Sequence, residues 1–186
     1  MIRHGESEAN HARSHAGWEQ VPLTSNGVEQ AKLAGKKLSS IAFDQVFSSD
    51  LKRSVQTCET ALPDRVYETS ALLREISVGQ LSCKPFAECH ALYGETYDKS
   101  IELQDFTPFG GENHDMLVDR VSRFLSHAKQ LNNATIAVFA HEGTLRSTLE
   151  LVLNTPLSSA RFLCRNCCIS VFEYTDGAWR LNAWNI

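Results

Sequence analysis

The feature that most constrains the fold is a nearly continuous apolar run at residues 134–140, interrupted only by Thr135. The run has the length of a strand, and a strand that is buried on both faces lacks the usual alternation with polar residues. Apolar residues recur at helical spacing before it, over residues 114–131, and a second helical pattern follows at 143–153. We therefore predict an α/β fold with three layers, α/β/α, around a mostly parallel central sheet.

The rest of the chain continues this alternation, with no repeat and no linker-like change of composition, so residues 1–186 are expected to form a single domain. Further strands are predicted at residues 1–4, 43–48 and 65–67, and a hairpin over 168–174 and 179–183. Further helices are predicted after a cap at Thr24, after a cap at Ser49 or Asp50, and at 84–93. Residues 95–111 are expected to be mostly loop, and residues 80–113 to form a lid over the site.

Charge and composition exclude several classes of partner. The net charge is −4 and lysine and arginine form no block, so neither a nucleic acid nor an anionic membrane is expected to bind. The apolar run is too short to span a bilayer. No apolar leader precedes Arg3, and of the six cysteines only Cys164 and Cys167 have the spacing of a metal or redox pair, without the second pair of a structural zinc site. Buried thiols in a reducing compartment, the cytoplasm, are therefore expected, whereas the sequence assigns no oligomeric state.

Two histidine segments indicate the chemistry. Arg3-His4-Gly5-Glu6 and Ala140-His141-Glu142-Gly143 each follow a predicted strand, and ligands of open α/β sheets bind at the carboxyl ends of the strands. One imidazole can attack phosphorus while an arginine and the other imidazole neutralise the phosphoryl oxygens. His11 and His15 lack an accompanying acid and are expected to be exposed loop residues.

Five blocks in a fixed order are more specific than either histidine segment alone. They are Arg3-His4-Gly5-Glu6-Ser7-x-x-Asn10, Leu23-Thr24-x-x-Gly27-x-x-Gln30-Ala31, Ser48-Ser49-Asp50-Leu51-x-Arg53-x-x-Gln56-Thr57, Glu75 with Gly79, and His141-Glu142-Gly143. Together they cover nearly the whole chain, which resembles the histidine phosphatase (phosphoglycerate-mutase-like) superfamily.

The resemblance implies a role for each matching residue. His4 would be the nucleophile that forms a phosphohistidine, kept neutral by the neighbouring cations. Arg3 and Arg53 would hold the phosphoryl oxygens. His141 would donate to the same oxygens as an imidazolium, because a phosphate dianion favours that form. Glu75 would protonate the leaving alkoxide and then activate water.

Secondary contacts to phosphate or substrate are expected from Asn10 and Thr24, and from the backbone N–H of Gly143 at the start of a helix. No metal and no other cofactor is expected, because the two arginines and His141 supply the positive charge that magnesium provides in other phosphoryl-transfer sites.

Three functions follow from the resemblance. The first is a phosphatase acting on a small phosphorylated metabolite, the second a cofactor-dependent phosphoglycerate mutase, and the third a binding protein without catalysis. The absence of arginine between Arg74 and Arg120 favours the phosphatase, because the mutases hold the substrate carboxylate with an arginine pair in this stretch. The third function ranks last because His4, Arg53, Glu75 and His141 are all present.

The sequence after Gly79 departs from the family pattern, because Gln80, Leu81 and Ser82 stand where an aromatic residue and an acid are usual. This departure concerns recognition of the leaving group. Residues 161–168, beginning at Arg161, look most like the α-ribazole phosphatase and broad-specificity phosphatase branch, which suggests α-ribazole 5′-phosphate as a substrate. Only two residues precede Arg3, whereas strands usually have about five. We therefore expect a first strand that is cut short.

Overall fold

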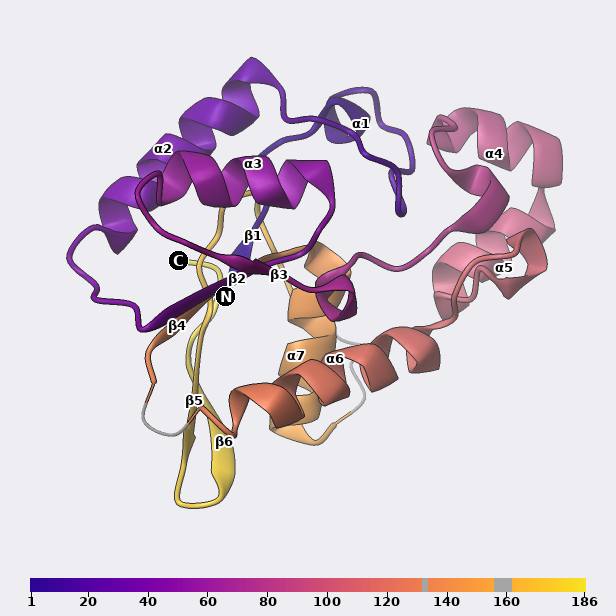
Figure 1. The fold of residues 1–186 in the computed structure, drawn as a ribbon. Coiled ribbons are helices and arrows are strands. Elements are labelled where there is room, and N and C mark those ends of the chain that lie inside the picture. Colours follow the sequence, from indigo (N-terminus) through magenta and orange to yellow (C-terminus); the bar gives the residue numbers. More distant parts are fainter. Residues whose placement is uncertain (132–133, 156–161) are drawn as a thin grey trace.

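The protein, described here as a computed structural model over residues 1–131, 134–155 and 162–186, is arranged around one parallel sheet (Figure 1). The strands lie in the order β1 (Ile2–Arg3), β4 (Ile136–Ala140), β2 (Gln45–Ser48) and β3 (Glu68–Thr69). Every neighbouring pair is parallel. The carboxyl ends of the strands therefore meet at one edge of the sheet.

The apolar run forms β4, which lies between β1 and β2 as its burial pattern predicts. Its register places Ala140 opposite Arg3 and Phe139 opposite Ser48. Side chains alternate between the two faces: Phe139 packs with Val46 on one face, and Val138 packs with Phe47 on the other. The strand is thus buried on both sides.

Helices cover both faces, which confirms the predicted three-layer α/β/α fold. On one side, α2 (Ser25–Leu38) and α3 (Lys52–Ala61) supply Leu38 and Cys58 to the core, and on the other α6 (His114–Ala128) and α7 (Glu142–Leu153) supply Phe124 and Leu145 (Figure 1). The hairpin is also confirmed, as β5 (Val171–Thr175) and β6 (Ala178–Ala183), and it pairs only with itself. No helix of the described ranges is long and apolar enough to cross a membrane.

Several local predictions are corrected. The cap of α3 is Leu51, whose apolar side chain cannot cap, rather than Ser49 or Asp50. The Asp50 carboxylate pairs with Arg74, and Ser49 Oγ accepts from the N–H of Leu51, outside the helix. The third strand lies at Glu68–Thr69 rather than at 65–67. The short helix α1 (Glu8–His11) was not predicted, and it begins at a capping box between Ser7 and Asn10. Of the residues singled out from the sequence, Arg161 lies outside the described ranges.

Residues 80–113 form a separate group of short helices at one side of the sheet (Figure 1). Residues 95–111, expected to be mostly loop, contain the helix α5. The elements here and just before are η1 (Ala71–Leu73), η2 (Gly79–Leu81), α4 (Phe86–Tyr93), α5 (Glu95–Leu103) and η3 (Thr107–Phe109). The elements from η2 to η3 enclose a small core of their own that includes Leu81, Cys89 and Phe109, whereas Leu73 of η1 belongs to the main core. His15, predicted to be exposed, is half-buried against this group, with its Nε2 2.9 Å from the Tyr97 hydroxyl.

Candidate active site

The two histidines lie side by side at the carboxyl edge of the sheet. His4 directly follows β1 and His141 directly follows β4, so the pairing of Arg3 with Ala140 brings them together. The ring centroids are 5.1 Å apart, with 58° between the ring planes. His4 is 3% exposed and His141 is 0% exposed.

A single hydrogen bond defines the tautomer of His4. Its Nδ1 lies 2.7 Å from the carbonyl oxygen of Gly5. Because a carbonyl oxygen only accepts, Nδ1 carries the proton and the neutral ring has its lone pair on Nε2. Burial, and then the charges of Arg53 and Arg3, hold the pKa of His4 well below its usual value of 6.5. His4 is therefore a neutral imidazole with one nucleophilic nitrogen.

Two arginines bring positive charge to this edge. Arg53, in the first turn of α3, is 1% exposed and donates to the carbonyl oxygens of Gly17 at 2.9 Å and Glu19 at 3.1 Å. Burial lowers its pKa to about 10, with Glu75 acting in the opposite direction, so it stays charged at neutral pH. The Arg3 guanidinium pairs with Glu142 at 2.9 Å, and its Nη1 also donates to a backbone carbonyl oxygen, that of Cys164.

His141 and Arg3 retain polar atoms without a protein partner. Among the described residues nothing bonds to either ring nitrogen of His141 or to Nε of Arg3, although all three atoms are buried. Buried polar atoms are normally satisfied. These three therefore indicate a polar group that comes from outside the chain.

The imidazolium that we predicted for His141 is not favoured in the unliganded pocket. Burial is the largest cause that holds its pKa well below 6.5, and the charge of Arg53 acts in the same direction. A bound dianion would reverse that balance, since an opposite charge within hydrogen-bonding distance favours the charged form.

Glu75 reaches this edge from the segment that follows η1. Its Oε1 accepts from the N–H of Ile76 at 2.9 Å, and its Oε2 accepts from the N–H of Gly143 at 3.3 Å. A Cβ at Gly143 would lie 2.1 Å from Oε1, so only glycine permits this approach. The Gly143 amide, which we expected to face phosphate, thus holds the carboxylate beside the start of α7.

The backbone that presents Glu75 is fixed by side chains for which the sequence analysis assigned no role. Arg120 donates to the carbonyl oxygens of Leu72 and Arg74 at 3.0 Å and of Glu75 at 3.1 Å. Trp18 donates through Nε1 to the same Glu75 oxygen at 2.7 Å. Periodicity could not reveal these bonds, because each crosses more than 40 residues of sequence.

The side chains of Thr24 and Asn10 bond to the segments around His4, and neither bonds to Arg3, Arg53 or His141. Thr24 caps α2, accepting from the N–H of Gly27 at 3.0 Å, and donates to the Glu6 carboxylate at 2.8 Å. Asn10 is exposed, and its Oδ1 accepts from the Ser7 N–H at 3.1 Å.

Other motif residues hold the same loop. The N–H of Gly5 donates to Thr57 Oγ1 at 3.0 Å, and the N–H of Glu6 donates to Gln30 Oε1 at 2.8 Å. A Cβ at Gly5 would meet the Gly27 carbonyl oxygen at 2.4 Å. Gly27 and Gln30 of the second sequence block and Thr57 of the third therefore hold the backbone next to His4.

The model of the histidine phosphatase superfamily (branch 1) matches residues 1–186. The chain belongs to the histidine phosphatase superfamily. A Proteus mirabilis protein named "probable phosphoglycerate mutase GpmB" is 33% identical over 194 residues, covering 100% of this chain and 89% of that protein. The adenosylcobalamin/alpha-ribazole phosphatase of Salmonella typhimurium is 28% identical over 190 residues, covering 100% and 94%. The crystal structure of the alpha-ribazole phosphatase from Shigella flexneri has a TM-score of 0.91 at 26% identity, covering 100% and 94%.

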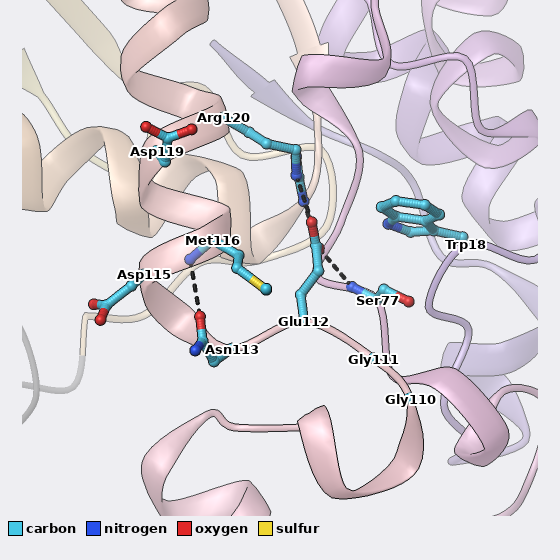
Figure 2. A pocket seen from close by; sticks show the side chains of 10 residues that line it. All are labelled: Trp18, Ser77, Gly110, Gly111, Glu112, Asn113, Asp115, Met116, Asp119 and Arg120. Atoms are coloured by element: carbon cyan, nitrogen blue, oxygen red, sulfur yellow. Dashed lines mark hydrogen bonds and ion pairs between the residues drawn. The ribbon is translucent and has the colours of Figure 1, made fainter.

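An open cavity of about 690 Å³ lies beside the segment that carries Glu75, since Trp18 and Arg120 of its lining both donate to the Glu75 carbonyl oxygen (Figure 2). Trp18 and Met116 lie on opposite sides of it, and the ion pair between Glu112 and Arg120, at 2.9 Å, lies between them. The other lining residues are Ser77, Gly110, Gly111, Asn113, Asp115 and Asp119. Its lining therefore contains three carboxylates and one guanidinium that is already paired. Residues 110–113 come from the end of the segment that we predicted to be a lid.

Within the described ranges no group of three or more histidine, cysteine, aspartate or glutamate side chains is arranged to hold a metal ion.

Proposed function

We propose that this histidine phosphatase hydrolyses a small phosphomonoester through a phosphohistidine on His4. The observation that carries the proposal is the buried pair of His4 and His141. One ring has a nucleophilic Nε2, and the other has two nitrogens without a partner among the described residues. A tetrahedral phosphoryl anion would accept from one of those His141 nitrogens and from the free Nε of Arg3.

The first step forms a bond from His4 Nε2 to phosphorus and breaks the bond from phosphorus to the ester oxygen. Arg3, Arg53 and His141 hold the non-bridging oxygens, and Glu75 gives its proton to the departing alkoxide. In the second step Glu75 takes a proton from water, the water oxygen forms a bond to phosphorus, and the bond from phosphorus to His4 Nε2 breaks, which releases inorganic phosphate and restores His4. Side chains supply all the positive charge in this scheme, so we propose that the reaction needs no metal.

The cavity beside Glu75 supports a phosphatase over a mutase. A phosphoglycerate carboxylate placed there would face Glu112 and Asp119, and the only guanidinium in the lining already donates to Glu112. The apolar walls of Trp18 and Met116 suit an uncharged or basic leaving group with a flat portion. α-Ribazole 5′-phosphate has such a group, and two similar proteins carry that substrate in their names. The mutase stays the second candidate because of the relative at 33% identity.

We also propose that the partner is a small phosphorylated metabolite in the cytoplasm. All six cysteines are free thiols, including Cys164 and Cys168, whose sulfurs lie 3.5 Å apart. Thiols this close without a disulfide fit a reducing compartment.

The test is a panel of phosphomonoesters assayed with a chelator present. Wild type is expected to hydrolyse at least one ester, His4→Ala to lose nearly all turnover, and the control His11→Ala, at an exposed histidine, to keep it. Rapid quench with labelled ester is expected to give an acid-labile adduct on His4. Turnover in His4→Ala, label on serine or a carboxylate, or activity abolished by the chelator would contradict the mechanism. To separate the mutase, 3-phosphoglycerate is supplied with a bisphosphoglycerate primer, and isomerisation without phosphate release would favour it.

A further inference from the structure

One turn contains three cysteines whose side chains have no role in the proposed reaction. Cys164, Cys167 and Cys168 are all buried, and they follow one another within five residues. The sulfur atoms of Cys164 and Cys168 are 3.5 Å apart, each in a residue that is 4% exposed. The two thiols are therefore in van der Waals contact but unbonded.

This turn is connected by hydrogen bonds to the residues that carry the reaction. The Arg3 guanidinium donates to the Cys164 carbonyl oxygen, and the Arg3 backbone N–H donates to that of Cys168 at 3.2 Å. The Cys167 N–H donates to the His4 carbonyl oxygen at 3.3 Å. A change in the geometry of the turn must therefore displace Arg3, His4 or both.

The two thiols differ chemically. The hydrogen bond between them lowers the pKa of Cys168 and raises that of Cys164, and the positive charge of Arg3 also lowers the pKa of Cys168. Cys168 is thus the better thiolate and Cys164 the thiol that donates to it. A low-pKa thiol with a second thiol in contact is the pairing from which a sulfenic acid condenses to a disulfide, and oxidation here also requires the peroxide to reach two buried sulfurs.

We propose that Cys164 and Cys168 form a reversible disulfide on reaction with a hydroperoxide, and that the disulfide lowers phosphatase activity. The Cys168 thiolate attacks the peroxide oxygen, which gives a sulfenic acid and releases water once a proton is taken up. The Cys164 sulfur then attacks the Cys168 sulfur, the S–S bond forms, and a second water leaves. Overall two thiols are oxidised and one hydrogen peroxide is reduced to two waters.

Forming the bond shortens the sulfur–sulfur distance from 3.5 Å to about 2.05 Å. The part of this shift that the side chains do not take up by rotation moves the backbone of the turn, and with it the carbonyl oxygens that hold Arg3. Loss of one well-placed charge-assisted hydrogen bond to phosphate lowers kcat/KM about tenfold. This effect on activity rests on the proposed function, whereas formation of the disulfide does not.

The experiment uses a Cys83→Ser background, because Cys83 is an exposed cysteine. After hydrogen peroxide treatment the intact protein is expected to lose the mass of two hydrogens. Trypsin cleaves after Arg165, between the two cysteines, so the peptides on either side should stay linked until reduced. In parallel, kcat/KM is expected to fall about tenfold and to recover with dithiothreitol.

Four variants locate the effect. Cys164→Ser and Cys168→Ser should keep basal activity and lose both the peptide link and the peroxide response. Cys167→Ser and the buried control Cys58→Ser should keep both. The proposal is overturned if no linked peptides form, if they form with kcat/KM unchanged, or if Cys168→Ser still responds to peroxide. A protein that forms the link but hydrolyses no ester would overturn the proposed function and leave the disulfide itself standing.

Discussion

Gly143→Ala is expected to inactivate the enzyme without unfolding it. The added methyl group would lie 2.1 Å from Glu75 Oε1, where ordinary contacts begin at 3.4 Å, so the carboxylate must move by more than 1 Å. A misplacement of about 1 Å costs about a hundredfold in rate. The fold should tolerate the change, because the group that has to move is the end of a flexible side chain and alanine favours a helix over glycine by about 1 kcal/mol.

The assay compares two leaving groups in single-turnover phosphorylation. An alkyl phosphate needs a proton from Glu75, whereas p-nitrophenolate leaves without one, so Gly143→Ala should slow the alkyl ester about a hundredfold and p-nitrophenyl phosphate far less. The melting temperature serves as the control for stability.

The double variant decides whether the effect passes through Glu75. If it does, Gly143→Ala should add no further loss to Glu75→Gln, because both remove the same group from its position. An unchanged rate with the alkyl ester, an equal loss with both esters, or full additivity with Glu75→Gln would refute the reasoning.

Three further predictions concern protons and the loop around His4. Because the folded-state pKa values of His4 and His141 lie below 6.5, the unfolded chain binds protons below pH 6.5 that the folded chain does not. Stability should therefore be complete above pH 6.5 and fall as the pH drops below it, and a melting series should show a smaller fall in His141→Gln. Binding of inorganic phosphate near pH 7 should take up a proton at His141, which calorimetry in buffers of different ionisation enthalpy detects, and no uptake would count against the imidazolium. Thr57→Val should leave the buried Gly5 N–H without its acceptor and lower the free energy of unfolding by about 1–3 kcal/mol in urea titrations, whereas Thr60→Val in the same helix should not.

Strong periodicity made the core of the fold predictable. β4 and α6 have apolar patterns set by burial against the main core, and both lie within the ranges predicted from the sequence. The meeting of His4 and His141 was predictable for the same reason, since each follows a strand and parallel strands end at one edge.

Elements that depend on smaller or local contacts were missed. α5 buries only Tyr97 and Ser100, against the small core of residues 80–113, so its periodicity is too weak to separate a helix from a loop. The single turn of α1 rests on the Ser7–Asn10 capping box, a signal that was present in the sequence and was interpreted as a substrate contact.

The partners of backbone N–H groups could not be predicted. The amide of Gly143 could face either a ligand or a side chain, and its acceptor, Glu75, lies 68 residues earlier. Thr24 posed the same problem, because its bond to Glu6 depends on how closely two distant loops approach. Motif spacing identifies which residues gather, whereas which donor meets which acceptor is decided by packing.

The shortness of β1 has a consequence for when activity returns as the protein refolds. Two ladder pairs join β1 to β4, and the remaining backbone bonds of Arg3 and His4 go to Ala140, Cys167 and Cys168. Contacts across so many residues form late, because the intervening chain must be ordered first. His4 therefore has no fixed position until residues 164–170 have folded against it. During refolding from denaturant, phosphatase activity should return with the docking of residues 164–170 and not with the earlier formation of the helices.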